Sequence, residues 1–169
     1  MTSSPQDSDL PAFSAGAEQL LERAGDLCRR NGTKLTPLRR QVLGILLEAG
    51  KPAGAYDILT HLQACHAGAA PPTVYRALDF LLEQGLIHKI ERLSSFVPCT
   101  HILDHHGCDH EGEGMHATQF LICRTCGGVT ELEDSGIIAA TVQATRSIGF
   151  RVQHSTVEIE GLCASCIGA

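Results

Sequence analysis

Two Cys-x-x-Cys pairs constrain this 169-residue chain more than any other feature. Each pair puts two sulfur atoms on one tight turn, and four thiolates complete a tetrahedral zinc site. Such a site can contribute on the order of 10 kcal/mol to the folding of a small domain. A redox-active dithiol is the alternative, but neither pair follows the strand–helix pattern of a thioredoxin-like site. We therefore predict a structural zinc site formed by Cys123, Cys126, Cys163 and Cys166.

The N-terminal stretch, MTSSPQDSDLPAFSAG, has neither the basic flank nor the apolar centre of a signal peptide. Its Ser, Pro and Asp content predicts a disordered arm over residues 1–16. No apolar run approaches the ~20 residues of a membrane span. We expect a cytoplasmic protein with no membrane partner. Thiols stay reduced in the cytoplasm, so the eight cysteines favour metal binding over disulfides.

Charge and metal-binding residues are distributed unevenly along the chain. Residues 17–98 carry 10 basic and 8 acidic side chains, whereas residues 99–169 carry 3 and 9. Six of the nine histidines and six of the eight cysteines lie at or beyond position 99. This asymmetry indicates two domains with different partners.

The first part of the chain reads as four helices followed by a hairpin. Thr36 is the expected N-cap of the second helix, Pro37 suits its first position, and Gly50 ends it. Four short helices and a small hairpin match a winged helix-turn-helix arrangement. The expected segments are helices at 17–31, 36–50, 55–66 and 71–85, and two strands within 86–98.

The fourth helix separates apolar from polar residues, as a DNA-recognition helix must. Its apolar stripe consists of Val74, Ala77, Leu78, Leu81 and Leu82. Its polar side carries Thr73, Tyr75, Arg76 and Asp79. Arginine has a fork that fits the O6 and N7 atoms of guanine. An ordinary surface helix is an equally good reading of the pattern, and the near-neutral charge of residues 17–98 does not favour DNA.

The last part of the chain predicts a small α/β unit. Strands are expected at 118–123 and 127–133, then a helix capped by Asp134 or Ser135 and stopped by Gly149. Residues 150–163 read as one or two further strands. No H-x-E motif, phosphate-binding glycine loop or nucleophile elbow is present, so we predict neither an enzyme nor a small-molecule substrate.

A dense cluster of metal-binding side chains lies between the two parts. The stretch CTHILDHHGCDHEGEGMH, residues 99–116, holds five histidines and two cysteines. A cation bound by His88, Cys99, His116 and Glu131 would join the two domains. The spacing of these four residues does not by itself select them, and a lone histidine or glutamate on a strand is usually only solvated.

The sequence resembles the ferric uptake regulator superfamily, and within it the zinc uptake regulator branch. The resemblance covers residues 17–169 and rests on LTPLRRQVL, AYDIL, PPTVYRALDFLLEQGLIHKIE, ICRTCGGVTE and GLCASC. It implies a winged-helix DNA-binding domain (17–97), a hinge with a His-rich loop (98–117) and an α/β dimerisation domain (118–169). The implied protein is a homodimer that binds a palindromic operator in double-stranded DNA and represses zinc-uptake genes when loaded with zinc.

The resemblance also implies roles for individual residues, with two zinc ions per chain. The four CxxC cysteines match its structural zinc ligands. The regulatory zinc ligands correspond to His88, Cys99, His116 and Glu131. Tyr56 and Arg76 match residues that contact DNA, and we expect Thr73 and Tyr75 to touch the backbone or base edges nearby.

One departure from the branch is an extended link between Cys99 and His116. It contains the additional residues His101, His105, His106, Cys108 and His110. Such a loop could bind metal weakly or be an insertion without function. A His-rich segment also occurs in iron- and peroxide-sensing members, so a sensor of iron, manganese or peroxide is the alternative. The Cys99 thiolate favours zinc over these metals. From another class, the chain could be a zinc-stabilised interaction module that does not bind DNA.

Overall fold

The computed structural model describes residues 13–99, 116–132, 134–152 and 154–168. The chain divides into two compact units, residues 1–107 (unit 1) and 108–169 (unit 2). The extra histidines and Cys108 of the 100–115 loop lie outside the described residues, as do residues 1–12 of the arm predicted over 1–16. Residues 13–16 of that arm are described, and the first helix already begins at Ala15. None of the described helices combines the length and apolar composition needed to cross a membrane.

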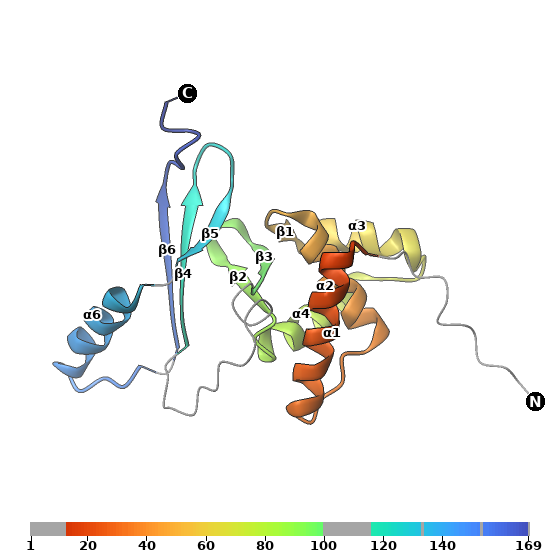
Figure 1. Cartoon of the computed structure of the whole chain (residues 1–169), viewed down its shortest axis with the longest axis horizontal. Coiled ribbons are helices and arrows are strands. Elements are labelled where there is room, and N and C mark those ends of the chain that lie inside the picture. The colour runs from red at the N-terminus through yellow and green to blue at the C-terminus, as the bar shows by residue number, and fades with distance from the viewer. Residues whose placement is uncertain (1–12, 100–115, 133, 153, 169) are drawn as a thin grey trace, which may run out of the picture. The chain divides into compact units, whose positions relative to one another are not determined.

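Unit 1 begins with four helices (Figure 1). Ser14 caps the first helix, and its hydroxyl accepts from the backbone N–H of Ala17. Thr36 caps the second by accepting from Arg39 N–H, and Gly50 ends that helix with a left-handed backbone, as predicted. The helices are α1 (Ala15–Arg30), α2 (Pro37–Ala49), α3 (Ala55–Cys65) and α4 (Pro71–Glu83).

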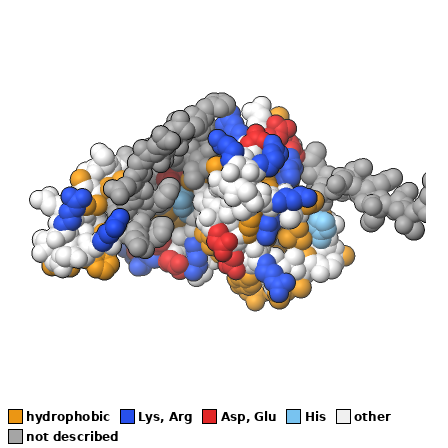
Figure 2. All heavy atoms as spheres, turned by 90° about the horizontal axis from the view of Figure 1, so that it is seen from below, with side chains coloured by type: hydrophobic (Ala, Val, Ile, Leu, Met, Phe, Trp, Pro, Cys, Tyr) orange, Lys and Arg blue, Asp and Glu red, His pale blue; other side chains and the backbone are white. Residues whose placement is uncertain are grey.

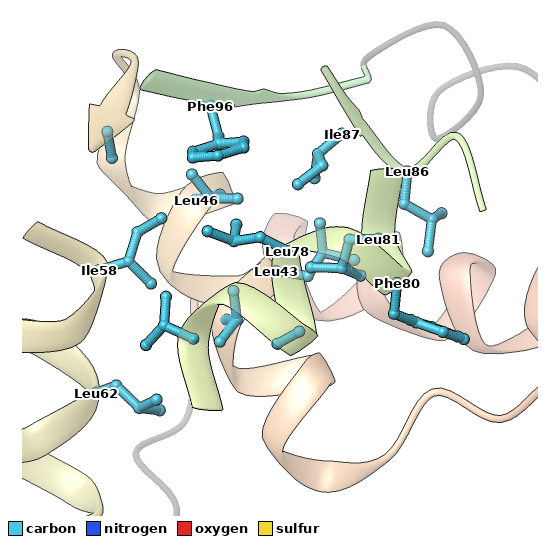
Figure 3. Close-up of a cluster of buried hydrophobic side chains, with 14 of the residues drawn as sticks. Leu43, Leu46, Ile58, Leu62, Leu78, Phe80, Leu81, Leu86, Ile87 and Phe96 are labelled. Carbon is cyan, nitrogen blue, oxygen red and sulfur yellow. The ribbon is translucent and has the colours of Figure 1, made fainter. Parts of the chain in front are cut away.

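The core of unit 1 is formed where these helices meet the hairpin strands. Leucine, isoleucine and phenylalanine side chains from α2, α3, α4 and the hairpin converge there (Figure 3). The predicted stripe of α4 is buried at Val74, Ala77, Leu78 and Leu81. Leu82 is half-buried and packs against the core, and Phe80, outside the predicted stripe, is buried as well.

A three-stranded antiparallel sheet completes unit 1. The hairpin consists of β2 (Ile87–Ile90) and β3 (Ser95–Pro98), joined by a short 3₁₀ turn, η1 (Glu91–Leu93). Ser94 turns the chain with a φ of 47°, a left-handed conformation uncommon for a residue with a side chain. A two-residue strand that the sequence did not predict, β1 (Ala53–Gly54), pairs with β3. The winged-helix class is thus confirmed, with one strand added.

Unit 2 is a three-stranded sheet with one helix. The strands are β4 (His116–Cys123), β5 (Val129–Leu132) and β6 (His154–Gly161), with β4 in the centre. β4 runs antiparallel to β5 and parallel to β6. Helix α6 (Ser135–Arg146) connects β5 to β6. Its N-cap residue, Asp134, accepts from the N–H groups of Gly136 and Ile137.

The helix α6 is not part of a packed core. None of its side chains is buried, and it stands to one side of β6 rather than across the sheet (Figure 1). The amide of Gln119, on β4, donates to the carbonyl of Asp134 and ties the start of α6 to the sheet. The mixed α/β class predicted for the chain is confirmed, but unit 2 keeps apolar surface exposed on both its helix and its sheet.

Candidate metal centres and nucleic-acid interface

Strand topology brings the two CxxC pairs together. Because β4 and β6 are parallel, their C-terminal ends lie at the same edge of the sheet, with Cys123 opposite Gly161. Each pair then forms a turn that closes on its first cysteine. Gly127 N–H donates to the carbonyl of Cys123 (2.9 Å), and Cys166 N–H donates to that of Cys163 (2.8 Å). Residues far apart in the sequence therefore present four thiols at one place.

The four thiols fit a zinc ion. Their sulfur atoms all lie within 4.8 Å of one another, and the Sγ atoms of Cys126 and Cys163 are 3.9 Å apart. A tetrahedral site with Zn–S bonds of about 2.3 Å requires sulfur atoms about 3.8 Å apart. All four cysteines are free thiols. The donor set is that of a closed structural site, in which no coordination position remains for a substrate.

Hydrogen bonds already favour one thiolate in this cluster. The backbone N–H groups of Cys126, Cys163 and Thr125 point at Cys123 and lower its pKa to about 6. The N–H of Cys163 donates to Cys123 Sγ over 3.4 Å. The opposite holds for Cys166, where the Cys163 thiol and burial raise the pKa to about 12. Metal binding at neutral pH therefore has to displace protons from the cluster.

Unit 1 contains half of the second predicted metal site. His88 lies on β2 and Cys99 follows β3, and Cys99 N–H donates to the carbonyl of Leu86 (2.9 Å). A ring nitrogen of His88 and the Sγ of Cys99 lie within 4.8 Å of each other, close enough to share one ion. Cys99 is 3% exposed, so its thiol is shielded from solvent.

The other two predicted ligands belong to unit 2. His116 is the first residue of β4, and Glu131 is half-buried on β5. The strand register pairs Glu131 with Phe120 rather than with His116. Four residues of strand, roughly 13 Å at about 3.3 Å per residue, separate His116 from Phe120. The backbone of β4 and β5 thus does not by itself place His116 beside Glu131.

Helix α4 exposes the polar residues predicted to read DNA. Tyr75, Arg76 and Asp79 are exposed, and Thr73 is half-buried. Tyr56, in the first turn of α3, is 70% exposed, and Tyr75 is 45% exposed. Figure 2 shows basic and acidic side chains close together on one face of the molecule, and residues 17–98 as a whole carry 10 basic and 8 acidic side chains. Any recognition of DNA here depends on individual contacts more than on net charge.

The sequence did not reveal that the two tyrosines share a feature. They flank a small apolar notch between the first turns of α3 and α4. Its other lining residues are Ala55, Leu59, Pro71 and Val74. Each of these had an unremarkable place in its own helix. Only the crossing of α3 and α4 brings them together, and no local pattern in the sequence reports that crossing.

Known proteins share this architecture. The model of the "Ferric uptake regulator family" matches residues 30–160. The chain therefore belongs to the ferric uptake regulator family. This family consists of transcription regulators, so the prediction that the chain is not an enzyme is confirmed.

Within the family, the chain is similar to zinc regulators. It is 37% identical to the zinc uptake regulation protein of Escherichia coli K12, over 89% of this chain and 82% of that protein. A solved structure of a zinc uptake regulator complexed with zinc and DNA matches with a TM-score of 0.79 and 37% identity, covering 90% of this chain and 95% of that one. The structure of holo XcZur matches with a TM-score of 0.74 and 37% identity, covering 92% and 100%. The predicted placement in the zinc uptake regulator branch is confirmed.

Proposed function

We propose that this family member is a zinc-responsive DNA-binding regulator that represses zinc-uptake genes when it is loaded with zinc. The observation that carries the proposal most is the pairing of the His88 ring with the buried Cys99 thiol. Family members differ in the metal that they sense, and sulfur with imidazole favours zinc over iron or manganese. The similarity to zinc uptake regulators supports the same choice.

Two zinc ions per chain follow from the two donor sets. The CxxC cysteines would hold a structural ion. His88 and Cys99 from unit 1, with His116 and Glu131 from unit 2, would hold a regulatory ion, and zinc supplies tetrahedral coordination to such ligands.

The regulatory effect would be a shift in population. Without the second ion the two units sample many relative orientations, and a shared ligand set restricts them to few. If the restricted form is the one that binds DNA, then zinc binding and DNA binding strengthen each other by the same factor. Low zinc would release the operator, and transcription of the uptake genes would resume. The place of such a regulator is the cytoplasm, where the DNA lies.

A homodimer is the proposed functional form. Unit 2 leaves Leu121 and Ile159 about 40% exposed on one face of its sheet, and α6 leaves its apolar side chains unburied. Exposed apolar side chains of this kind suit contact with a second copy of the chain. Two copies related by a twofold axis would present two α4 helices to a palindromic site. Ile159→Lys should give a monomer in sedimentation velocity with both zinc ions retained.

DNA contact is assigned to Tyr56, Thr73, Tyr75 and Arg76. Arg76→Ala should abolish preferential binding to the operator, whereas an interaction module without DNA binding would be unaffected. Arg76→Lys is the informative companion because it keeps the charge and loses the guanidinium fork. It should lower the preference for the operator over random DNA and leave the dependence of affinity on salt nearly unchanged.

The decisive experiment is native mass spectrometry during stepwise chelation, with DNA binding followed in parallel. We expect two zinc ions per chain, and loss of DNA binding as the first one leaves. Cys99→Ser should remain folded, hold one zinc ion and lose zinc-dependent DNA binding. Cys65→Ser is the control, since Cys65 is an exposed thiol outside both sites. One zinc ion in the wild type, or DNA binding indifferent to the second, would refute zinc sensing.

A further inference from the structure

The C-terminal end of α4 is held by side chains from the loop that joins α1 to α2 and from the first turn of α2. The guanidinium of Arg39 lies over the ring of Phe80, 3.5 Å from its centroid. One residue beyond the helix, the side-chain Oε1 of Gln84 accepts from Asn31 Nδ2 (3.3 Å) and Thr33 Oγ1 (3.0 Å). Phe80 and Gln84 are four residues apart and so lie on one side of the helix. The loop and the start of α2 therefore contact one side of α4, at the end opposite the residues proposed to contact DNA.

Arg39 is central to these contacts with α4. While its guanidinium covers Phe80, its Nη1 donates to the carbonyl of Lys34 (2.8 Å). One planar group thus joins α4, α2 and the loop before α2. Lysine could keep the charge at this position, but it lacks the flat fork that stacks and donates at once.

Because α4 is long, a small change in its angle at the C-terminal end produces a large displacement of the residues at its N-terminal end. Nine residues separate Tyr75 from Gln84, which is about 14 Å along a helix. A rotation of about 10° around Gln84 would move the backbone of Tyr75 by about 2 Å. Hydrogen bonds to base edges tolerate only a few tenths of an ångström. The angle set near Phe80 therefore decides whether Arg76 and Tyr75 meet the bases in register.

We propose that Arg39 is a positioning residue for sequence discrimination. It acts through Phe80 and the 31–36 loop to fix the angle of α4, and it does not itself contact DNA. The proposal rests on the DNA-binding function proposed above. It assigns to an arginine outside the recognition helix the control of how strongly the protein prefers its operator to other sequences.

The test compares Arg39→Lys with Arg40→Lys in the full-length, zinc-loaded protein. Arg40 is the matched control, because it is the adjacent arginine on α2 and its partner is Glu18 on α1. The probes are a duplex selected by the wild-type protein from a randomised pool and a scrambled duplex of equal length. Affinities for both are measured over a range of salt concentrations, together with the melting temperature.

Arg39→Lys should lower the ratio of operator to scrambled affinity about threefold to tenfold, and Arg40→Lys should leave it unchanged. The slope of log affinity against log salt should stay at the wild-type value. A slope reduced by about 1 would mean that Arg39 contacts a phosphate directly and would overturn the proposal. A lower melting temperature with an unchanged affinity ratio would overturn it too, since Arg39 would then be only structural.

A second variant guards against an indirect effect of Arg39→Lys. Phe80→Leu keeps an apolar side chain at α4 and removes the ring. It should reduce the same affinity ratio, and the double variant should lose no more than the larger single loss. Additive losses would refute a common mechanism. If the wild type itself does not discriminate between the two duplexes, the proposed function fails and this role with it. Discrimination kept by Arg39→Lys refutes only the positioning role.

Discussion

The two units of the chain reach a folded structure by different means. In unit 1, nineteen buried residues from four helices and the hairpin form one continuous cluster. In the described part of unit 2, the buried side chains are Gln119, Phe120, Ile122 and Cys123. Burial of apolar surface contributes roughly 25 cal/mol per Å², so unit 1 has a large stabilising term that unit 2 lacks.

Unit 2 buries little apolar surface, but it contains a cluster of side chains that can bind a metal ion. Its two CxxC turns converge because β4 and β6 are parallel, and a zinc ion there would replace part of a missing core. The exposed faces of its sheet and of α6 leave further stabilisation to a second copy of the chain. If unit 2 holds the proposed zinc ion and pairs with a second copy, its stability should respond to both, whereas unit 1 depends mainly on its own packing.

Removing one thiolate should produce the largest difference in stability between the two units. Cys123→Ser deletes a ligand of the four-thiol cluster and the group that receives the N–H of Cys163. Because structural zinc contributes on the order of 10 kcal/mol, we expect unit 2 to unfold while unit 1 stays folded. Hydrogen exchange resolved along the chain checks this directly.

The chain supplies a separate optical probe for unit 1. Both tyrosines, Tyr56 and Tyr75, belong to unit 1, and the chain has no tryptophan. Tyrosine fluorescence of Cys123→Ser should therefore match the wild type. Cys65→Ser, the control, should keep both the zinc content and the exchange pattern. Protection of unit 2 amides that survives in Cys123→Ser would show that the cluster is not needed for folding.

Truncating a core leucine should have the opposite effect and destabilise unit 1 rather than unit 2. Leu81 is 0% exposed in unit 1, and Leu81→Ala should lower the free energy of unfolding of that unit by about 2–5 kcal/mol. Leu121 on the sheet of unit 2 is 39% exposed, so Leu121→Ala should cost unit 2 less than about 1 kcal/mol before any effect on dimerisation. Hydrogen exchange resolved along the chain at increasing urea, which reports on both units, should show the loss in unit 1 for Leu81→Ala and little change in unit 2 for Leu121→Ala. Equal losses would mean that unit 2 has a packed core after all.

Local sequence signals predicted the ends of elements better than their packing. Thr36, Gly50 and Asp134 each act through their own backbone neighbours, so their capping roles could be read from the sequence. Strand β1 could not, because its two residues gain their hydrogen bonds only from β3. Phe80 lies at the edge of the predicted stripe on α4, and it is buried because Arg39 covers its ring.

For the candidate site, too, the sequence predicted local features better than those that depend on how separate elements pack. The four CxxC cysteines form one cluster, as their spacing indicates, since each pair carries its own turn. Of the second ligand set, the structure brings together His88 and Cys99, while the joint role of all four residues stays a prediction from family resemblance. The notch between Tyr56 and Tyr75 could not be predicted, because it depends on how α3 crosses α4.

A close contact near the N-terminus tests how tightly unit 1 is packed. An added Cβ at Gly44 would lie 2.2 Å from the ring of Phe13, so this glycine makes room for the ring against α2. Alanine favours a helix over glycine by up to about 1 kcal/mol. Gly44→Ala should therefore be about 1–2 kcal/mol more favourable in a Phe13→Ala background than in the wild type. Urea unfolding of the four proteins measures the coupling, and additive effects would mean that Phe13 is not held on α2.

The smallest expected effect concerns an ion pair between α1 and α2 in the same unit. The Arg40 guanidinium holds the pKa of Glu18 below its ordinary value. A carboxylate with a lowered pKa in the folded state adds stability above its unfolded pKa and loses it as pH falls through the folded value. About a third of each side chain is exposed, so Glu18→Gln should cost less than about 1 kcal/mol at pH 7. The difference between the variant and the wild type should disappear in urea titrations once the pH lies below the folded pKa of Glu18. A difference that persists there would assign the effect to the hydrogen bond from Phe13 N–H rather than to charge.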